Sequence, residues 1–114
     1  KTKLINLQYG DVSEEIERLK NEYGIEVIQL PEIDNTNDLD GLASLIMACD
    51  KVVSISNFSI HLAGALGKQA HVLLAYCSDW RWGQKPNSNY WYDSVCLHRQ
   101  TIINDWKTAL NKLH

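Results

Sequence analysis

Residues 49–74 read CDKVVSISNFSIHLAGALGKQAHVLL, and the organisation of the whole chain can be worked out from this segment. The run at 52–55 is apolar and β-branched, which is typical of a buried strand. Residues 56–59 form a polar turn rich in N-capping side chains, and a helical pattern follows from 60 to 66, where Gly67 provides a stop. Residues 70–75 return to an apolar strand. This order predicts two parallel strands joined by a crossover helix.

The same alternation of strands and helices extends over the rest of the chain. Further strands are expected at 3–8, 25–30 and 94–98. Helices are expected from Ser13 to the stop at Gly24, and from a cap at Asn37 or Asp38 to residue 48. A last helix is expected after Thr101, with one apolar face formed by Ile102, Trp106, Leu110 and Leu113. The pattern predicts one α/β domain over 1–114, a three-layer sandwich around a parallel five-strand sheet.

Composition excludes several classes of function. The formal net charge of −3 offers no general attraction to nucleic acid or to an anionic membrane. No apolar run approaches the roughly 20 residues that a membrane-spanning helix needs, and no signal peptide is visible. Cys49, Cys77 and Cys96 lie far apart without metal-ligand spacing, so we expect buried free thiols, no metal site and a cytoplasmic location.

Four segments carry a resemblance to a known family. Residues 56–68 read SNFSIHLAGALGK, and the others are LQYGD at 7–11, DWRW at 79–82, and WY at 91–92 running on to RQ at 99–100. Together they resemble heptosyltransferase-like glycosyltransferases of the GT-B fold, and more closely the catalytic end of bacterial tetratricopeptide-repeat proteins. The four segments occur in the expected order and span nearly the whole chain.

The resemblance implies a Rossmann-like, donor-binding C-terminal half of an inverting, metal-independent enzyme. Its donor substrate would be a nucleotide-diphosphate sugar, with no further cofactor. A missing N-terminal GT-B half, and possibly tetratricopeptide repeats, would be its partners, since the chain opens with Lys1 like a piece of a longer protein. In the family one more strand lies mid-sheet before the segment at 3–11. Without it, the simplest sheet order is 2-1-3-4-5, which follows the doubly wound rule.

Ligands of such sheets bind beyond the carboxyl ends of the strands. We expect the diphosphate at the helix start formed by Ser56, Asn57, Phe58, Ser59 and His61, where free N–H groups favour an anion. The loops at 9–11 and 31–34 meet at the same edge, so Tyr9, Asp11, Glu14 and Ile33 are candidates for binding the base and ribose. It implies no catalytic residue here, because the general base of GT-B enzymes usually comes from the other half.

Each candidate also has a structural interpretation. The serines and Asn57 can simply cap a helix, a histidine at a helix start is often structural, and Asp11 can be a charge favoured by a helix dipole. Many heptosyltransferases have Asp-Thr-Gly where this chain has Ser56, Asn57 and Phe58, so the specificity for heptose is open. The alternative function is a non-catalytic α/β module that binds a nucleotide or a protein partner.

The aromatic segment at 76–93 is expected to be a packed excursion. We predict that Trp80 and Trp82 are buried, with a cation–π contact to Arg81, in preference to stacking on a sugar. Trp106 is expected in the core. His71 and His98 are expected to be strand or loop residues without chemistry.

Overall fold

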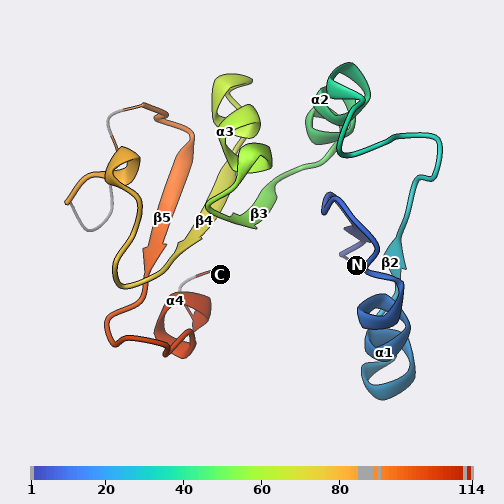
Figure 1. Cartoon of the computed structure of the whole chain (residues 1–114), viewed down its shortest axis with the longest axis horizontal. Helices are drawn as coiled ribbons and strands as arrows, with labels where there is room; N and C mark the ends of the chain where they lie inside the picture. The colour runs from blue at the N-terminus through green and yellow to red at the C-terminus, as the bar shows by residue number, and fades with distance from the viewer. Residues whose placement is uncertain (1, 85–88, 90, 112, 114) are drawn as a thin grey trace. The chain divides into compact units, whose positions relative to one another are not determined.

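The computed structural model describes residues 2–84, 89, 91–111 and 113, which form an α/β fold with parallel strands (Figure 1). The chain divides into two compact units, Lys1–Ser44 and Leu45–His114. The first unit holds β1 (Leu4–Ile5), α1 (Ser13–Tyr23) and β2 (Val27–Ile28). The helix α2 (Leu39–Ala48) crosses the boundary. The second unit contains β3 (Val52–Ile55), α3 (Phe58–Ala65), β4 (Ala70–Leu74), the short 3-10 helix η1 (Trp80–Trp82), β5 (Val95–Arg99) and α4 (Lys107–Asn111).

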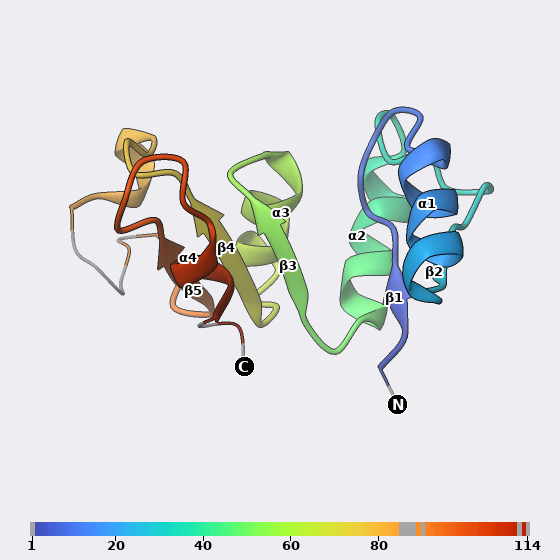
Figure 2. The same ribbon diagram turned by 90° about the horizontal axis from the view of Figure 1, so that it is seen from below.

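The second unit is built on a three-strand parallel sheet in the order β3-β4-β5. Val52 pairs with Ala70, and Ala70 pairs with Val95, so both ladders start at the same level. The three strands lie side by side in both views (Figures 1 and 2). The helix α3 contacts β3 and β4, whereas α4 contacts β4 and β5. The strand–helix–strand unit predicted at 52–75 is therefore confirmed.

The first unit contains a shorter sheet than the sequence predicts. Its strands β1 and β2 pair in parallel over two residues each, in place of the runs expected at 3–8 and 25–30. One reason lies at the end of α1, where Gly24 adopts a left-handed conformation with φ 65°. The N–H of Ile25 then donates to the carbonyl of Leu19 at 3.2 Å, so it closes the helix and does not join a strand.

The five expected strands are all present, but they form two sheets, β1-β2 and β3-β4-β5. A single sheet of order 2-1-3-4-5 requires β1 to pair with β3, and no ladder of the described residues contains that pair. The structure thus does not show the predicted five-strand sheet. It does show two parts of the predicted strand order, 2-1 and 3-4-5.

The core lies mostly in the second unit. Buried apolar side chains alternate along β4, and further ones lie on β3, β5, α3 and η1: Val52, Ile60, Ala63, Ala70, Val72, Leu74, Trp82, Val95 and Leu97. Leu42, Leu45 and Ile46 of α2 are also buried. Within the described residues, no helix has both the length and the apolar character needed to cross a membrane.

Two helix ends are fixed by side chains. Asp38 Oδ1 accepts the N–H of Gly41 at 2.9 Å, which confirms Asp38 as the N-cap of α2. At the other end, Lys68 Nζ donates to the carbonyls of Met47 at 3.0 Å and Cys49 at 2.6 Å. A cation at this position satisfies carbonyl groups that have no partner within a helix.

The last helix is shorter than predicted and begins at Lys107. Asn104 has φ 62°, a left-handed conformation that a helix from Thr101 would not allow. The N–H of Lys107 then finds a new cap in Asp105 Oδ1 at 3.0 Å. The expected apolar face is accordingly lost, since Ile102 is 62% exposed, and Trp106, at 37%, is not the core residue that we predicted.

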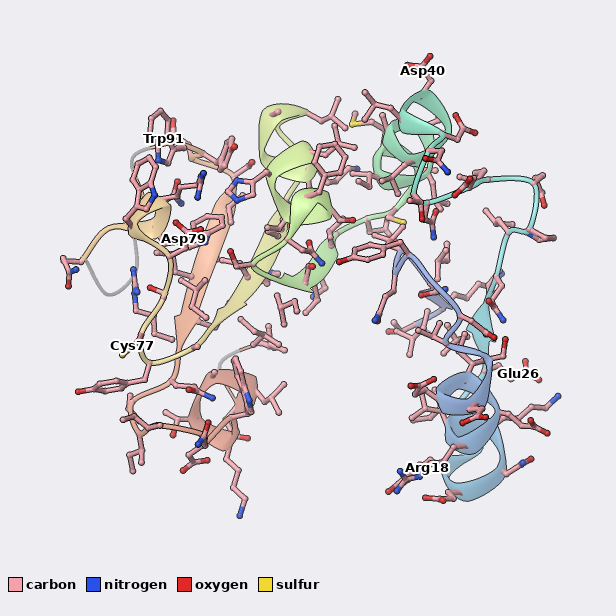
Figure 3. All side chains as sticks on the ribbon, in the orientation of Figure 1. Arg18, Glu26, Asp40, Cys77, Asp79 and Trp91 are labelled. Carbon is pink, nitrogen blue, oxygen red and sulfur yellow. The ribbon has the colours of Figure 1, made fainter. Side chains whose placement is uncertain are left out.

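The expectation of buried thiols is also wrong for two cysteines. All three cysteines are free, but Cys77 and Cys96 are exposed and Cys49 is half-buried. Cys77 extends from the loop after β4 (Figure 3). Cys96 lies between buried Val95 and Leu97 on β5, so the alternation of a strand turns its side chain to the opposite face.

Candidate functional site

The site expected for the diphosphate lies where β3 ends and α3 begins. Asn57 is the N-cap of α3, and its Oδ1 accepts the N–H of Ile60 at 3.3 Å and the hydroxyl of Ser54 at 3.0 Å. The N–H groups of Phe58 and Ser59 have no acceptor within the described residues. Two free backbone donors at the positive end of the helix dipole are thus available to an anion.

The other side chains of this turn differ in their access to a ligand. Ser56 is exposed, and its oxygen accepts the indole N–H of Trp82 at 2.9 Å, which leaves its own proton free to donate. Phe58 is 59% exposed. Ser59 is 7% exposed, so it presents its backbone N–H to a ligand more readily than its hydroxyl.

His61 is held by two aromatic side chains from the segment before β5. Its Nδ1 lies 3.2 Å from the hydroxyl of Tyr92, and its ring stacks on Trp82 with 4.9 Å between centroids. Partial burial lowers the pKa of His61, and the nearby charge of Arg81 lowers it further, while Asp79 raises it. The imidazole is therefore neutral at pH 7, and Nε2 has no partner among the described residues.

Trp80 and Trp82 behave differently, although both lie in η1. Trp82 is 0% exposed, as predicted, whereas Trp80 is 73% exposed, so the expectation of two buried tryptophans is half wrong. Asp79 caps η1 by accepting the N–H of Arg81, whose guanidinium also bonds the Asp79 carboxylate and lies 4.8 Å from the centre of the Trp80 ring. The predicted cation–π contact is thus confirmed, but on the surface. Asp79 and Trp91 both lie in this segment (Figure 3).

Arg99 at the end of β5 anchors this aromatic segment. Its guanidinium donates to Ser78 Oγ at 2.6 Å and to the carbonyls of Trp82 at 3.0 Å and Gly83 at 2.8 Å. No carboxylate forms an ion pair with it among the described residues. The backbone carbonyls therefore accept the hydrogen bonds of the charged guanidinium in place of a carboxylate. In this way Arg99 links the sheet to the backbone that carries Trp82.

Replacing Arg99 with methionine should lower the free energy of unfolding by about 2 kcal/mol, because two carbonyls lose a charged donor. Chemical denaturation of the two chains measures this difference. The control is Arg18→Met, whose side chain is 71% exposed in an i,i+4 pair with Glu22. Loss of that exposed ion pair should lower the free energy of unfolding by less than about 0.5 kcal/mol. Equal losses in the two variants would contradict an anchoring role for Arg99.

The residues expected for the base and ribose are only partly brought together, in the first unit. Tyr9 and Ile33 line an open cleft of about 550 Å³ at the carboxyl ends of β1 and β2. The other residues of its wall are mainly polar: Asn6, Gln8, Gly10, Gln29, Leu30, Pro31, Asp34, Asn35 and Thr36. Asp11 and Glu14 do not line it. Asp11 instead accepts the N–H and hydroxyl of Ser13, which lowers the pKa of its carboxyl.

His71 and His98 form a pair that the sequence did not indicate. They lie on β4 and β5, with His71 Nδ1 2.9 Å from His98 Nε2. His98 is buried and His71 is half-buried. One ring must donate and the other must accept, so at least one nitrogen of this contact must be unprotonated.

Acid should therefore destabilise the fold through His71. Burial, helped by the charge of Lys51, lowers the pKa of His71 below its ordinary value of 6.5. The unfolded chain then binds more protons than the folded one, so this contribution to stability is complete above pH 6.5 and is lost as the pH falls through the lowered pKa. Melting curves between pH 7.5 and pH 5 measure it. A His71→Gln variant should show a smaller loss, and an unchanged pH dependence would contradict the assignment.

The described residues contain no group of three or more histidine, cysteine or acidic side chains placed to hold a metal ion. The candidate site instead consists of the backbone N–H groups of Phe58 and Ser59, the hydroxyl of Ser56 and the imidazole of His61. Such groups bind an oxyanion by hydrogen bonds.

The sequence missed the residues that hold His61 in place. Tyr92 and Arg99 belong to segments that carry the family resemblance, but no local pattern assigns them a contact with the turn at 56–61. Gly64 gives a weak signal, as a glycine inside a helical pattern usually has a packing reason. A Cβ at this position would overlap the ring of Tyr92.

Comparison with known proteins gives one relative. No family model matches the chain, and no solved structure does. The chain is 44% identical over 110 residues to Protein FlbA of Caulobacter vibrioides. That match covers 96% of this chain and 18% of FlbA, so the chain spans less than a fifth of the length of its curated relative.

Proposed function

We propose that the chain is a nucleotide-sugar-binding domain of an inverting, metal-independent glycosyltransferase of the GT-B type. The observation that carries this proposal is the start of α3, where the free N–H groups of Phe58 and Ser59 lie beside Ser56 and a neutral, oriented His61. It lies at the carboxyl end of β3, where open α/β sheets bind their ligands. The resemblance at 56–68 supports the same position.

In the proposed reaction, an acceptor hydroxyl attacks the anomeric carbon of the donor sugar. The bond between that carbon and the diphosphate oxygen breaks, and its electron pair leaves with the nucleoside diphosphate. A base outside this chain takes the acceptor proton. The donors at the start of α3 would stabilise the charge that develops on the leaving diphosphate, and such fixed donors act most strongly where charge develops in the transition state.

The binding is expected to be weak in the chain alone. A helix dipole contributes only about 0.3–1 kcal/mol at an exposed site, whereas millimolar affinity already requires about 4 kcal/mol. The remaining contacts would come from the proposed N-terminal half. The three free cysteines, two of them exposed, fit a reducing compartment, and we propose the cytoplasm as the location.

Ligand-detected NMR of the chain with UDP-glucose, ADP-glucose and GDP-mannose tests this function, with free glucose as the control. At least one nucleotide-sugar should bind saturably, with a Kd of about 1 mM or weaker, and no nucleoside diphosphate should be released. If none of the three binds better than glucose does, the proposal is wrong.

A further inference from the structure

We infer that Tyr92 is a positioning residue for His61. Its hydroxyl donates to Nδ1 of the imidazole, so that the proton resides on Nε2 and an N–H is presented to the anionic ligand. This inference rests on the proposed function for its ligand, but its geometry belongs to the chain itself. The residues concerned come from α3 and from the segment before β5.

The ring of His61 is restrained in two directions. The hydroxyl of Tyr92 lies 3.2 Å from Nδ1, and the Tyr92 ring meets the imidazole edge-on, at 60° between the planes. On its face, the imidazole stacks on Trp82 at an interplanar angle of 19°. The stacking fixes the plane of the imidazole, and the hydrogen bond fixes which nitrogen points away from Tyr92.

Tyr92 is itself held in place on both sides. Its N–H donates to Asn89 Oδ1 at 2.7 Å, and Asn89 Nδ2 donates back to the carbonyls of Tyr92 and Val95. On the other side the ring rests over Gly64, where any Cβ would overlap it. A glycine inside α3 costs roughly 0.5–1 kcal/mol relative to alanine, and room for this ring explains its presence.

The direction of the hydrogen bond follows from the acidity of the two groups. A phenol is a good donor, and a neutral imidazole nitrogen is a stronger base than a phenol oxygen, so Tyr92 donates and Nδ1 accepts. In a neutral histidine, the bond made by one nitrogen decides where the proton sits on the other. With the opposite tautomer, a lone pair on Nε2 would face the ligand and repel an anion.

The neutral form of the His61 imidazole has two tautomers, and the hydrogen bond from Tyr92 selects one of them. Burial and the charge of Arg81 lower the pKa of His61, so at pH 7 the ring has one proton to place. Without Tyr92, the ring could carry it on either nitrogen.

The ring nitrogen shifts of His61, measured by NMR on the 15N-labelled chain, test the inference without any ligand. Wild type should show the Nε2–H tautomer. In Tyr92→Phe, which keeps the aromatic ring and so should fold, the Nδ1–H form should become populated. Tyr76→Phe is the control, because Tyr76 is 54% exposed and its one hydrogen bond to a described side chain is made by its backbone N–H. An Nδ1–H tautomer in wild type, or identical spectra in wild type and Tyr92→Phe, would overturn the inference.

A titration with inorganic pyrophosphate then connects the tautomer to binding. Tyr92→Phe should weaken binding about fivefold, the effect of one hydrogen bond, while Tyr76→Phe binds as wild type does. A changed tautomer with unchanged binding would overturn the link between Tyr92 and the ligand. If wild type binds no pyrophosphate while the tautomer still depends on Tyr92, the proposed function fails and the positioning of His61 stands.

Discussion

Trp82→Ala should lower the free energy of unfolding by at least about 3 kcal/mol. The side chain is 0% exposed, and its indole N–H donates to Ser56 at 2.9 Å. It also stacks on His61. Alanine would therefore remove apolar burial, one hydrogen bond and a ring contact in a single change, and leave a cavity beside His61.

The neighbouring Trp80 provides the matched control. It lies two residues away in the same 3-10 helix, but it is 73% exposed, and the centre of its indole ring lies 4.8 Å from the guanidinium carbon of Arg81. Its replacement by alanine should cost no more than about 0.5–1 kcal/mol, the value of an exposed cation–π contact. Urea denaturation of both variants measures the difference, and equal midpoints for Trp82→Ala and wild type would contradict a structural role for this indole.

His61→Ala should lower the rate of sugar transfer by about 100-fold in the full-length enzyme that we propose, since removing one donor to developing charge has effects of this size. The stacking on Trp82 means that His61 also packs more than a first-turn side chain usually does. We therefore expect a decrease of a few degrees in melting temperature, without loss of the fold.

A second histidine separates the two effects. His71 is also half-buried and hydrogen-bonded, but its partner is His98 on the sheet. His71→Gln should reduce stability while leaving kcat nearly unchanged. Transfer assays and thermal melts of both variants decide the matter: full activity in His61→Ala would remove His61 from the site, and a collapse of its melting curve would make it a structural residue.

The sequence predicts the centre of the fold well, because local signals agree there. The apolar runs of β3 and β4, the cap at Asn57 and the stop at Gly67 all favour the observed unit, and Gly67 has the left-handed φ of 70° that such a stop requires. In contrast, the start of the last helix is set by the left-handed conformation of one residue, Asn104. No sequence pattern predicts that conformation. The periodicity of 102–113 alone extends the helix too far.

The position of the start of α3 could be predicted from the sequence, but the contacts of its side chains could not. Helix capping and the carboxyl-end rule place Ser56, Asn57 and His61 together, and the structure confirms that they share one turn and helix start. The contact between His61 and Tyr92 joins residues 31 positions apart. Such a pairing depends on how the aromatic segment folds back, which secondary-structure signals do not encode. The exposure of Trp80 also depends on how this segment folds back, so the sequence does not predict it.

We propose that an oxyanion of a nucleotide-diphosphate sugar binds at the start of α3. Backbone amide shifts of the 15N-labelled chain, followed during a titration with a nucleoside diphosphate such as UDP or ADP, test it most directly. The amide signals of Phe58, Ser59 and His61 should move together and saturate, with a Kd of about 1 mM or weaker. Amide signals that stay in place at these residues up to about 20 mM ligand, or that move only elsewhere in the chain, would contradict the claim.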